Sequence, residues 1–269
     1  MVFRKNPKLR WVKYAGNWNN YPGQALSYKF QRWILNHNFH RGVVTINGHW
    51  PDQPDHIYSF LNPSFTEDEY LEEKKLAVEK KLSFPVNLIF VGNFNKAKGV
   101  DQVIEIARRL SDKSFDFRLT LVGGGPEKSR LEEIVKNNSL GDRVYFTGWQ
   151  PITALNRFYR KAHLFLFPSK SEGWPKVFSE AMAHGVVPIA SNIASIPEIL
   201  AESGAGLAIP PEDINAYVDA VINFTQDETA WKQASLNGLK AAGDFTYESY
   251  LSAVKNMFQK TWSVDLSHD

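Results

Sequence analysis

The sequence predicts an α/β fold built on a doubly wound parallel sheet, with a second and incomplete unit at its amino-terminal end. From Pro85 onward, short apolar segments alternate with amphipathic helical segments, which is the pattern of βαβ units. Some of these apolar segments are continuous runs, as expected for strands buried on both faces of a parallel sheet. Residues 1–84 differ, because they are rich in Trp, Tyr, His and Asn and carry a single strand, helix, strand unit.

The composition excludes several classes of protein. The chain has 269 residues, of which 43% are hydrophobic and 22% are charged, and these values are ordinary for a globular protein of one large or two small domains. Its 31 basic and 29 acidic residues are too evenly balanced to indicate nucleic-acid binding. The absence of cysteine excludes disulfides, thiolate catalysis and cysteine-bound metals, and it fits a cytoplasmic location. Without a signal-peptide core or an apolar run of about 18 residues, the protein is expected to be soluble or peripheral to a membrane.

Residues 1–84 contain the elements of the incomplete unit. Leu9–Tyr14 alternates like a strand, Gln24–Leu35 has helical spacing, and Val43–Ile46 is a second apolar strand. Three prolines interrupt Gly48–Pro63, which is therefore expected to be a loop, and the charged helix Thr66–Lys81 is expected to be a surface connector. One strand, helix, strand unit cannot bury both faces of its sheet, so it must pack on the rest of the chain, on a partner or on a segment that is absent.

The strands and helices of the second part follow in regular alternation. Strands are expected at Val86–Val91, Phe117–Val122, Val144–Phe146, Leu164–Phe167, Val187–Ala190 and Leu207–Ile209. Helices are expected over Val100–Leu110, 127–137, 154–161, 175–184, 214–224, Glu228–Ala242 and Tyr247–Trp262. These elements divide the chain into residues 1–84, a sheet domain over 85–245 and a terminal helix segment over 246–269. Ligands of such sheets bind at the carboxyl ends of the strands.

The segment Ser169–Gly185 joins the end of one expected strand to the start of a helix. Pro175 has the fixed φ angle and the missing donor that suit a first helical position, and Gly185 is a natural stop. The first-turn amides of Lys176 and Val177 would face the carboxyl edge of the sheet, where a helix amino terminus attracts phosphate. This segment is therefore a candidate phosphate site.

Two glutamates lie eight positions apart in the same segment. Glu180 is about 7.5 Å along the helix from its start, which suits the distance between a diphosphate and a ribose hydroxyl. Glu172 lies in the preceding loop and can reach the same crevice, so that one carboxylate would hold a ribose and the other a sugar. The simpler alternative is that both are ordinary solvated carboxylates.

This segment resembles the Glu, seven residues, Glu motif of the retaining family 4 glycosyltransferases, with its Glu-Gly-aromatic opening and its Glu-Ala-Met-Ala-x-Gly close. The resemblance implies a GT-B fold, in which two Rossmann-like domains face each other across a cleft. It implies that Glu172 faces the donor sugar as a catalytic residue and that Glu180 binds the nucleotide ribose. The sugar and phosphate would be held by the backbone of Gly173, Trp174, Lys176 and Val177.

Lys98 follows the first strand of the second part, at the carboxyl edge of the expected sheet, where a lysine can meet a diphosphate as a point charge. The family has a Lys-Gly pair at this place that contacts the diphosphate, so the resemblance assigns Lys98 to the catalytic site. Asn93 stands where the family usually has arginine and is the corresponding donor-binding position, with Lys96 as an alternative cation. The simpler alternative for Lys98 is a solvated loop lysine.

The remaining motifs carry weaker signals. Gly123–Pro126 lacks G-x-G-x-x-G spacing and resembles the Gly-x-Gly-Pro turn that shapes the cleft in the same family. In the resembled family, the backbone of the loop that corresponds to Phe146–Pro151 holds the nucleobase, and the resemblance therefore implies that Gln150 contributes to nucleobase binding. The alternative is that this loop is an ordinary turn with an exposed tryptophan. His163 is expected to be a partly buried structural residue, and His184 a cation at a helix end. Neither histidine has metal-type spacing, so no metal site is expected.

The resemblance implies a hexosyltransferase that moves a sugar from a nucleotide-diphosphate sugar to an acceptor hydroxyl with retention of configuration, in polysaccharide or glycoconjugate biosynthesis. The donor is a substrate, and no cofactor is expected. The acceptor would be a sugar, a lipid-linked sugar or a glycoconjugate, and no nucleic-acid partner is expected. The expected location is cytoplasmic, with peripheral association with the inner face of the membrane left open.

Residues 1–84 resemble only the closing segment of the acceptor-side domain of this family. Most of that domain would be missing, so the isolated chain is expected to bind donor weakly and not to transfer sugar to an acceptor. The alternative function is a catalytically silent module that binds a nucleotide sugar or regulates a partner. Binding without turnover would favour that alternative.

Overall fold

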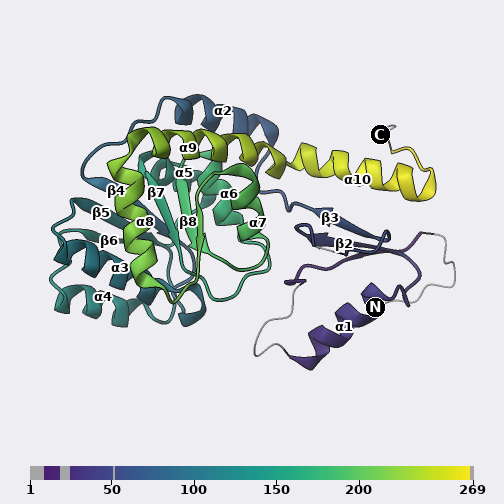
Figure 1. Ribbon diagram of the computed structural model, residues 1–269, viewed down its shortest axis with the longest axis horizontal. Coiled ribbons are helices and arrows are strands. Elements are labelled where there is room, and N and C mark those ends of the chain that lie inside the picture. Colours follow the sequence, from purple (N-terminus) through teal and green to yellow (C-terminus); the bar gives the residue numbers. More distant parts are fainter. Residues whose placement is uncertain (1–8, 19–24, 51, 267–269) are drawn as a thin grey trace.

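The computed structural model describes residues 9–18, 25–50 and 52–266, which form two parallel β-sheets with helices around them (Figure 1). The large sheet has six strands in the order β6-β5-β4-β7-β8-β9, and the small sheet has three in the order β1-β2-β3. All the paired strands are parallel. This arrangement confirms the predicted class, an α/β protein with a doubly wound parallel sheet. None of the described helices is long and apolar enough to cross a membrane.

The bounds of the elements follow the predicted alternation closely. The strands are β1 (Trp11–Lys13), β2 (Val43–Asn47), β3 (Ile57–Phe60), β4 (Val86–Val91), β5 (Phe117–Val122), β6 (Val144–Gly148), β7 (Leu164–Phe167), β8 (Val187–Ser191) and β9 (Leu207–Ile209). The α-helices are α1 (Leu26–Asn36), α2 (Glu67–Val78), α3 (Val100–Asp112), α4 (Lys128–Asn137), α5 (Ile152–Lys161), α6 (Lys176–Ala183), α7 (Ile196–Ser203), α8 (Ile214–Gln226), α9 (Glu228–Ala242) and α10 (Tyr247–Trp262). The short 3-10 helices are η1 (Lys96–Lys98) and η2 (Gly243–Phe245).

The large sheet forms the core of the protein. All the side chains of its inner strand β7 are buried, because helices cover both faces of the sheet (Figure 1). Strand β4 lies directly beside β7, with Leu88 paired to Leu164. Burial of each such side chain stabilises the fold by roughly 1.5–3 kcal/mol. The strand order also brings the carboxyl ends of β4 and β7, which are far apart in the sequence, to the same edge of the sheet.

The small sheet contains one strand more than predicted. Strand β3 lies inside Gly48–Pro63, which was expected to be a loop, and it pairs with β2 through Val44 and Ile57. The buried side chains of Ile57 and Phe60 supply the apolar contacts of this strand. Prolines before and after the strand favour a loop in a sequence-based prediction, whereas tertiary packing decides the outcome.

Helices α1 and α10 cover opposite faces of the small sheet. Leu35 of α1 packs in one apolar cluster with Val44, whereas Val254 and Met257 of α10 pack in another with Val43. Successive residues of a strand point to opposite faces, so the two helices lie on the two sides of β2. Helix α10 thereby connects the large-sheet unit to the small sheet (Figure 1). The predicted start of α1 at Gln24 lies outside the described residues.

Two helices differ from the sequence-based expectation. Helix α2 is more than a surface connector, because Tyr70 and Ala77 are buried and the helix packs on α6 and α9. The Tyr70 hydroxyl donates to the carbonyl oxygen of Leu239 at 2.8 Å, and Thr66 begins the helix with a capping box that includes Glu69. Helix α7 is absent from the prediction; it follows β8 and packs on β9 and α9.

Polar side chains of α2 and α5 meet the buried His184, the C-cap of α6, with Glu73 buried and Arg160 exposed. Arg160 donates to both carboxylate oxygens of Glu73, at 2.6 and 2.9 Å, and His184 Nε2 lies 3.3 Å from the same carboxylate. Burial lowers the pKa of His184 to about 4. The prediction of a histidine cation at this helix end is therefore wrong, because the imidazole is neutral near pH 7. The carbonyl oxygen of His184 instead accepts a hydrogen bond from Lys80 Nζ at 2.6 Å.

His163 has the structural role that was predicted, although it is more completely buried than expected. Its side chain is 3% exposed, and its Nδ1 atom accepts the amide of Asn87 at 3.1 Å. Its ring contacts Trp231 edge to face, with 5.8 Å between the ring centroids. Burial lowers the pKa of His163 to about 4, so this histidine is also neutral near pH 7.

Candidate functional site

The segment predicted to hold phosphate follows β7 and opens helix α6. The helix begins at Lys176, one residue later than predicted, because Pro175 has extended backbone angles and is the N-cap. Among the described residues, the amides of Lys176 and Val177 have no hydrogen-bond acceptor. Gly185 follows the helix with a φ of +66°, as a helix stop requires. The first turn thus presents two free amides at the carboxyl edge of the large sheet, an arrangement that favours an anion.

Lys98 and Glu172 form an ion pair at this edge. Lys98 Nζ lies 2.6 Å from Glu172 Oε1, and the Ser169 hydroxyl donates to the same oxygen at 2.7 Å. Lys98 ends η1, which follows β4, and Glu172 follows β7, so the contact joins the loops of two neighbouring strands. The Glu172 side chain is 7% exposed and that of Lys98 is 28% exposed. A carboxylate so far out of water needs a partner, because an unpaired buried charge is costly.

Gly99 lets the two loops approach each other closely. It has a φ of +73°, and a Cβ atom at this position would lie 2.1 Å from the carbonyl oxygen of Pro168. The turn before it is fixed by Asn95, whose side-chain oxygen accepts the amide of Lys98 at 3.0 Å. This close approach explains why a glycine follows the lysine. The glycine allows Lys98 to come within reach of the loop that carries Glu172.

Glu180 is held by Tyr159, a residue that the sequence motifs do not single out. The Tyr159 hydroxyl donates to Glu180 Oε2 at 3.2 Å. Burial raises the pKa of Glu180, and the Tyr159 hydrogen bond and the Lys176 charge act in the opposite direction. The second oxygen of Glu180 receives no hydrogen bond from the described residues. Tyr159 thus orients the carboxylate and leaves one oxygen for a ligand hydroxyl.

Asn93 and Gln150 lie on the same edge of the large sheet. The strand order β6-β5-β4-β7 places Gln150 after β6, Asn93 after β4 and Glu172 after β7, so the predicted positions form a row. Asn93 is exposed. Gln150 Nε2 donates to the carbonyl oxygen of Thr147 at 2.9 Å, which ties the side chain to its own loop, and the adjacent Trp149 is 77% exposed.

Gly173 and Trp174 contact the rest of the protein instead of projecting freely. A Cβ atom on Gly173 would lie 2.6 Å from the carbonyl oxygen of Ala15, so the loop after β1 lies directly against this segment. The Trp174 ring stacks on Phe245 with 5.0 Å between centroids. At the site, these two residues can therefore offer only their backbone groups. Gly173 also joins the site loop to the segment after β1, and Trp174 joins it to η2.

Residues 72–241 match the model of a known family, Glycosyl transferases group 1. The chain belongs to this family. Over 151 residues it is 29% identical to the putative colanic acid biosynthesis glycosyltransferase WcaL of Escherichia coli strain K12, covering 54% of this chain and 37% of that protein. Over 201 residues it is 28% identical to the N-acetyl-alpha-D-glucosaminyl L-malate synthase of Bacillus anthracis, covering 73% of this chain and 49% of that protein. It therefore spans less than half the length of both relatives.

A solved structure gives the same picture of the architecture. Sucrose-phosphate synthase from Thermosynechococcus elongatus superposes with a TM-score of 0.71 at 19% identity, over 94% of this chain and 68% of that chain. At this identity the likeness concerns the fold alone, and it agrees with a Rossmann-like α/β protein. The group 1 match itself begins in α2 and ends in α9, so it includes all the predicted site residues and leaves out the small sheet.

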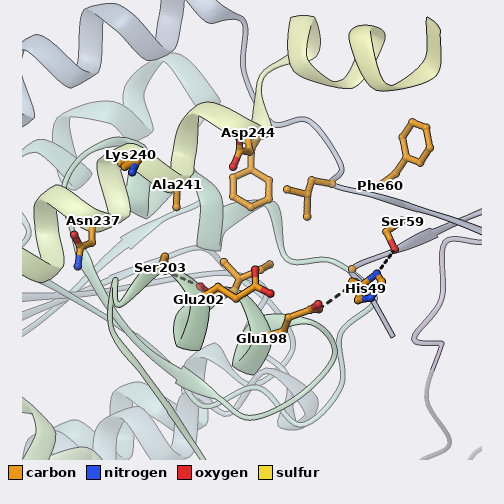
Figure 2. A pocket seen from close by; sticks show the side chains of 14 residues that line it. His49, Ser59, Phe60, Glu198, Glu202, Ser203, Asn237, Lys240, Ala241 and Asp244 are labelled. Atoms are coloured by element: carbon orange, nitrogen blue, oxygen red, sulfur yellow. Dashed lines mark hydrogen bonds between the residues drawn. The ribbon is translucent and has the colours of Figure 1, made fainter. Parts of the chain in front are cut away.

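A separate cavity of this group 1 protein lies between the small sheet and helices α7 and α9 (Figure 2). It has a volume of about 530 Å³, and its walls include His49, Ser59, Glu198 and Lys240. Glu198 accepts the backbone amide of His49 at 3.1 Å, and burial raises the pKa of Glu198. None of the predicted site residues lines this cavity. Its walls come from segments that are distant in the sequence, so no motif could indicate it.

Proposed function

We propose that this chain binds a nucleotide-diphosphate sugar at the carboxyl edge of the large sheet, as the donor-side part of a retaining glycosyltransferase. The observation that carries the proposal is the Lys98–Glu172 pair at the same edge of the large sheet as the free amides of α6. Glu180 lies one turn further along the same helix, with one carboxylate oxygen free for a hydroxyl. A cation, two amides and a carboxylate in this order suit a diphosphate followed by a ribose.

The proposed chemistry is a front-face transfer, in which the bond between the sugar and the nucleoside diphosphate breaks as the acceptor hydroxyl attacks the same face of the sugar, and the hydroxyl proton passes to the leaving diphosphate. Negative charge grows on the leaving diphosphate in the transition state. Lys98 and the amides of Lys176 and Val177 would stabilise that charge, which is electrostatic stabilisation by prearranged groups. Glu172 would face the sugar, and the approach of the diphosphate would draw Lys98 from Glu172 towards the phosphate oxygens.

The proposed partners are a nucleotide-sugar donor and a hydroxyl-bearing acceptor. The names of the two relatives refer to colanic acid biosynthesis and to the synthesis of N-acetyl-alpha-D-glucosaminyl L-malate. For this chain we propose a sugar, a lipid-linked sugar or a glycoconjugate as the acceptor. The proposed donor is a substrate, so the proposal needs no cofactor.

A thermal-shift screen of the purified chain with uridine, guanosine and adenosine diphosphate sugars tests the proposal. Stabilisation by one nucleotide class supports a donor site, and no stabilisation by any of them contradicts it. Transfer of a radiolabelled sugar then separates the two functions: labelled acceptor supports a transferase, whereas saturable binding without product supports the silent binding module. The expectation that the isolated chain binds donor without transferring it stays a prediction for the same assay.

Replacing Glu180 with alanine is expected to weaken nucleoside diphosphate binding about ten- to hundredfold, since a hydrogen bond to a charged group contributes about 1.5–3 kcal/mol. Isothermal titration calorimetry measures the change. Glu202→Ala is the matched control, because Glu202 is an exposed glutamate of α7 that lines the other cavity. Unchanged affinity of Glu180→Ala, or an equal loss in both variants, would remove Glu180 from the site.

A further inference from the structure

The cavity shown in Figure 2 lies on a seam between the small-sheet unit and the large-sheet unit. One wall comes from the loop after β2 and from β3, with His49 and Ser59, and the other comes from α7 and α9. Gly48 lies so close to α7 that a Cβ atom on it would be 2.4 Å from the Cβ atom of Ser195. Glu198 of α7 accepts the backbone amide of His49 at 3.1 Å. These two contacts close one side of the cavity, so its wall is formed before any ligand binds.

The ring of His49 presents a hydrogen-bond acceptor at this side. Gln53 Nε2 donates to the carbonyl oxygen of Ile57 at 2.6 Å, which leaves Gln53 Oε1 to accept the Ser59 hydroxyl at 3.1 Å. A hydroxyl has one proton to donate, so the Ser59 oxygen must accept from His49 Nδ1, which lies 3.3 Å away. Nδ1 therefore carries the proton of the neutral imidazole, and Nε2 is left as an acceptor. Among the described residues, Nε2 of His49 has no partner.

Glu198 offers a second acceptor at the same side. Its Oε2 atom accepts the His49 amide, and its Oε1 atom receives no hydrogen bond from the described residues. Burial and the charge of Glu202 raise the pKa of Glu198, whereas the hydrogen bond from the His49 amide acts in the opposite direction. A positively charged donor beside Oε1 would favour the ionised carboxylate and so oppose the effect of burial. This side of the cavity therefore suits a cationic group that donates hydrogen bonds.

The other side of the cavity carries an unpaired lysine. Lys240 of α9 lines the cavity, and in Figure 2 it lies across from His49 and Glu198. Asp244 follows one turn later and lines the same cavity, but neither residue forms an ion pair within the described part of the chain. The remaining walls include the apolar side chains of Leu61, Ile199 and Phe245. The cavity is therefore polarised, with acceptors at one side and an ammonium group at the other.

We propose that this cavity binds a small zwitterion of the amino-acid class, with its ammonium group at Glu198 and His49 and its carboxylate at Lys240. An ammonium group has three donors and no acceptor, which matches the acceptors of the first side, and both ends make charge-assisted hydrogen bonds. A dicarboxylate fits less well, because one of its charges would face Glu198, and one charge of a diamine would face Lys240. Since the walls come from both units, the bound zwitterion holds the small sheet against α7 and α9. The proposal is independent of donor binding and of glycosyl transfer.

Isothermal titration calorimetry of the full chain with glycine, γ-aminobutyrate and ε-aminocaproate tests the proposal. Each amino acid is compared with the carboxylate and the amine of the same length, such as caproate and hexylamine for ε-aminocaproate. We expect at least one of the three amino acids to bind about tenfold or more tightly than both of its analogues, because each analogue lacks one charge-assisted contact. The proposal is overturned if none of the amino acids binds better than its analogues.

Two variants assign the two ends of the ligand. Lys240→Met is expected to bind the best amino acid at least tenfold more weakly and to bind the matching amine as before. Glu198→Gln keeps an oxygen for the His49 amide but removes the charge, so it should weaken binding of both the amino acid and the amine at least tenfold.

Lys255→Met is the matched control, because Lys255 is an exposed lysine of α10 outside the cavity. It should bind the amino acid like the unchanged chain, and an unchanged thermal midpoint verifies the folding of all three variants. If Lys240→Met or Glu198→Gln binds the amino acid as tightly as the unchanged chain does, the zwitterion site is not in this cavity.

Discussion

Replacing Lys98 with alanine is expected to weaken nucleoside diphosphate binding at least hundredfold. Lys98 Nζ is 2.6 Å from Glu172, whose side chain is 7% exposed. Without the lysine, the diphosphate loses a cation and also meets a carboxylate whose charge is no longer balanced. Both effects act in the same direction, and together they correspond to about 3 kcal/mol. The loss should shrink as ionic strength rises, since the interaction is electrostatic.

Two further variants separate the effects at this site. Lys113→Ala is the matched control, because Lys113 is an exposed lysine at the carboxyl end of α3, away from this edge of the sheet, and its affinity should stay within about threefold of the unchanged chain. The double variant K98A/E172Q should bind more tightly than Lys98→Ala alone, because it removes the repulsive carboxylate. Calorimetry that finds Lys98→Ala and Lys113→Ala equally affected would place the diphosphate elsewhere.

The position of this site could be predicted because it depends on local signals. Strand β7 is a continuous apolar run, and Pro175 and Gly185 mark the start and the end of the helix that follows. Ligands bind at the carboxyl ends of such strands, so the sequence alone predicts that Lys98 and Glu172 lie at the same edge. Their direct contact could not be predicted, because it requires β4 and β7 to be neighbours, and strand order is a property of the whole sheet.

The features that the sequence did not reveal depend on contacts between distant segments. Tyr159 looks like an ordinary core residue of an amphipathic helix, and only the packing of α5 on α6 brings its hydroxyl to Glu180. Strand β3 is short and lies among prolines, so that its pairing with β2 and the burial of Phe60 decide its structure. His184 follows the simple dipole rule in the sequence, but the protein buries it beside Glu73, and the cost of desolvation outweighs the dipole.

The two buried histidines make the stability of the protein depend on pH. The pKa of His163 and that of His184 are both lowered by burial from 6.5 to about 4. Between these pH values the unfolded chain binds protons that the folded chain does not, so the free energy of unfolding falls as the pH decreases from about 6.5 to about 4. At pH 5 the loss is about 2 kcal/mol for each histidine. Lys80 and Arg160 lower the pKa of His184 further, whereas Glu73 acts against the shift.

The chain is therefore expected to lose about 4 kcal/mol of stability between pH 7.5 and pH 5, from these two groups alone. Urea unfolding at the two pH values measures the difference. In the variants His163→Asn and His184→Gln the loss on acidification should shrink by about 2 kcal/mol each, even though each variant starts from a lower stability at pH 7.5. His37→Gln is the control, because His37 is an exposed histidine of the small-sheet unit. Two outcomes would mean that these histidines are protonated as readily in the folded protein as in the unfolded chain. One is equal stability of the unchanged chain at both pH values, and the other is an undiminished loss in the two histidine variants.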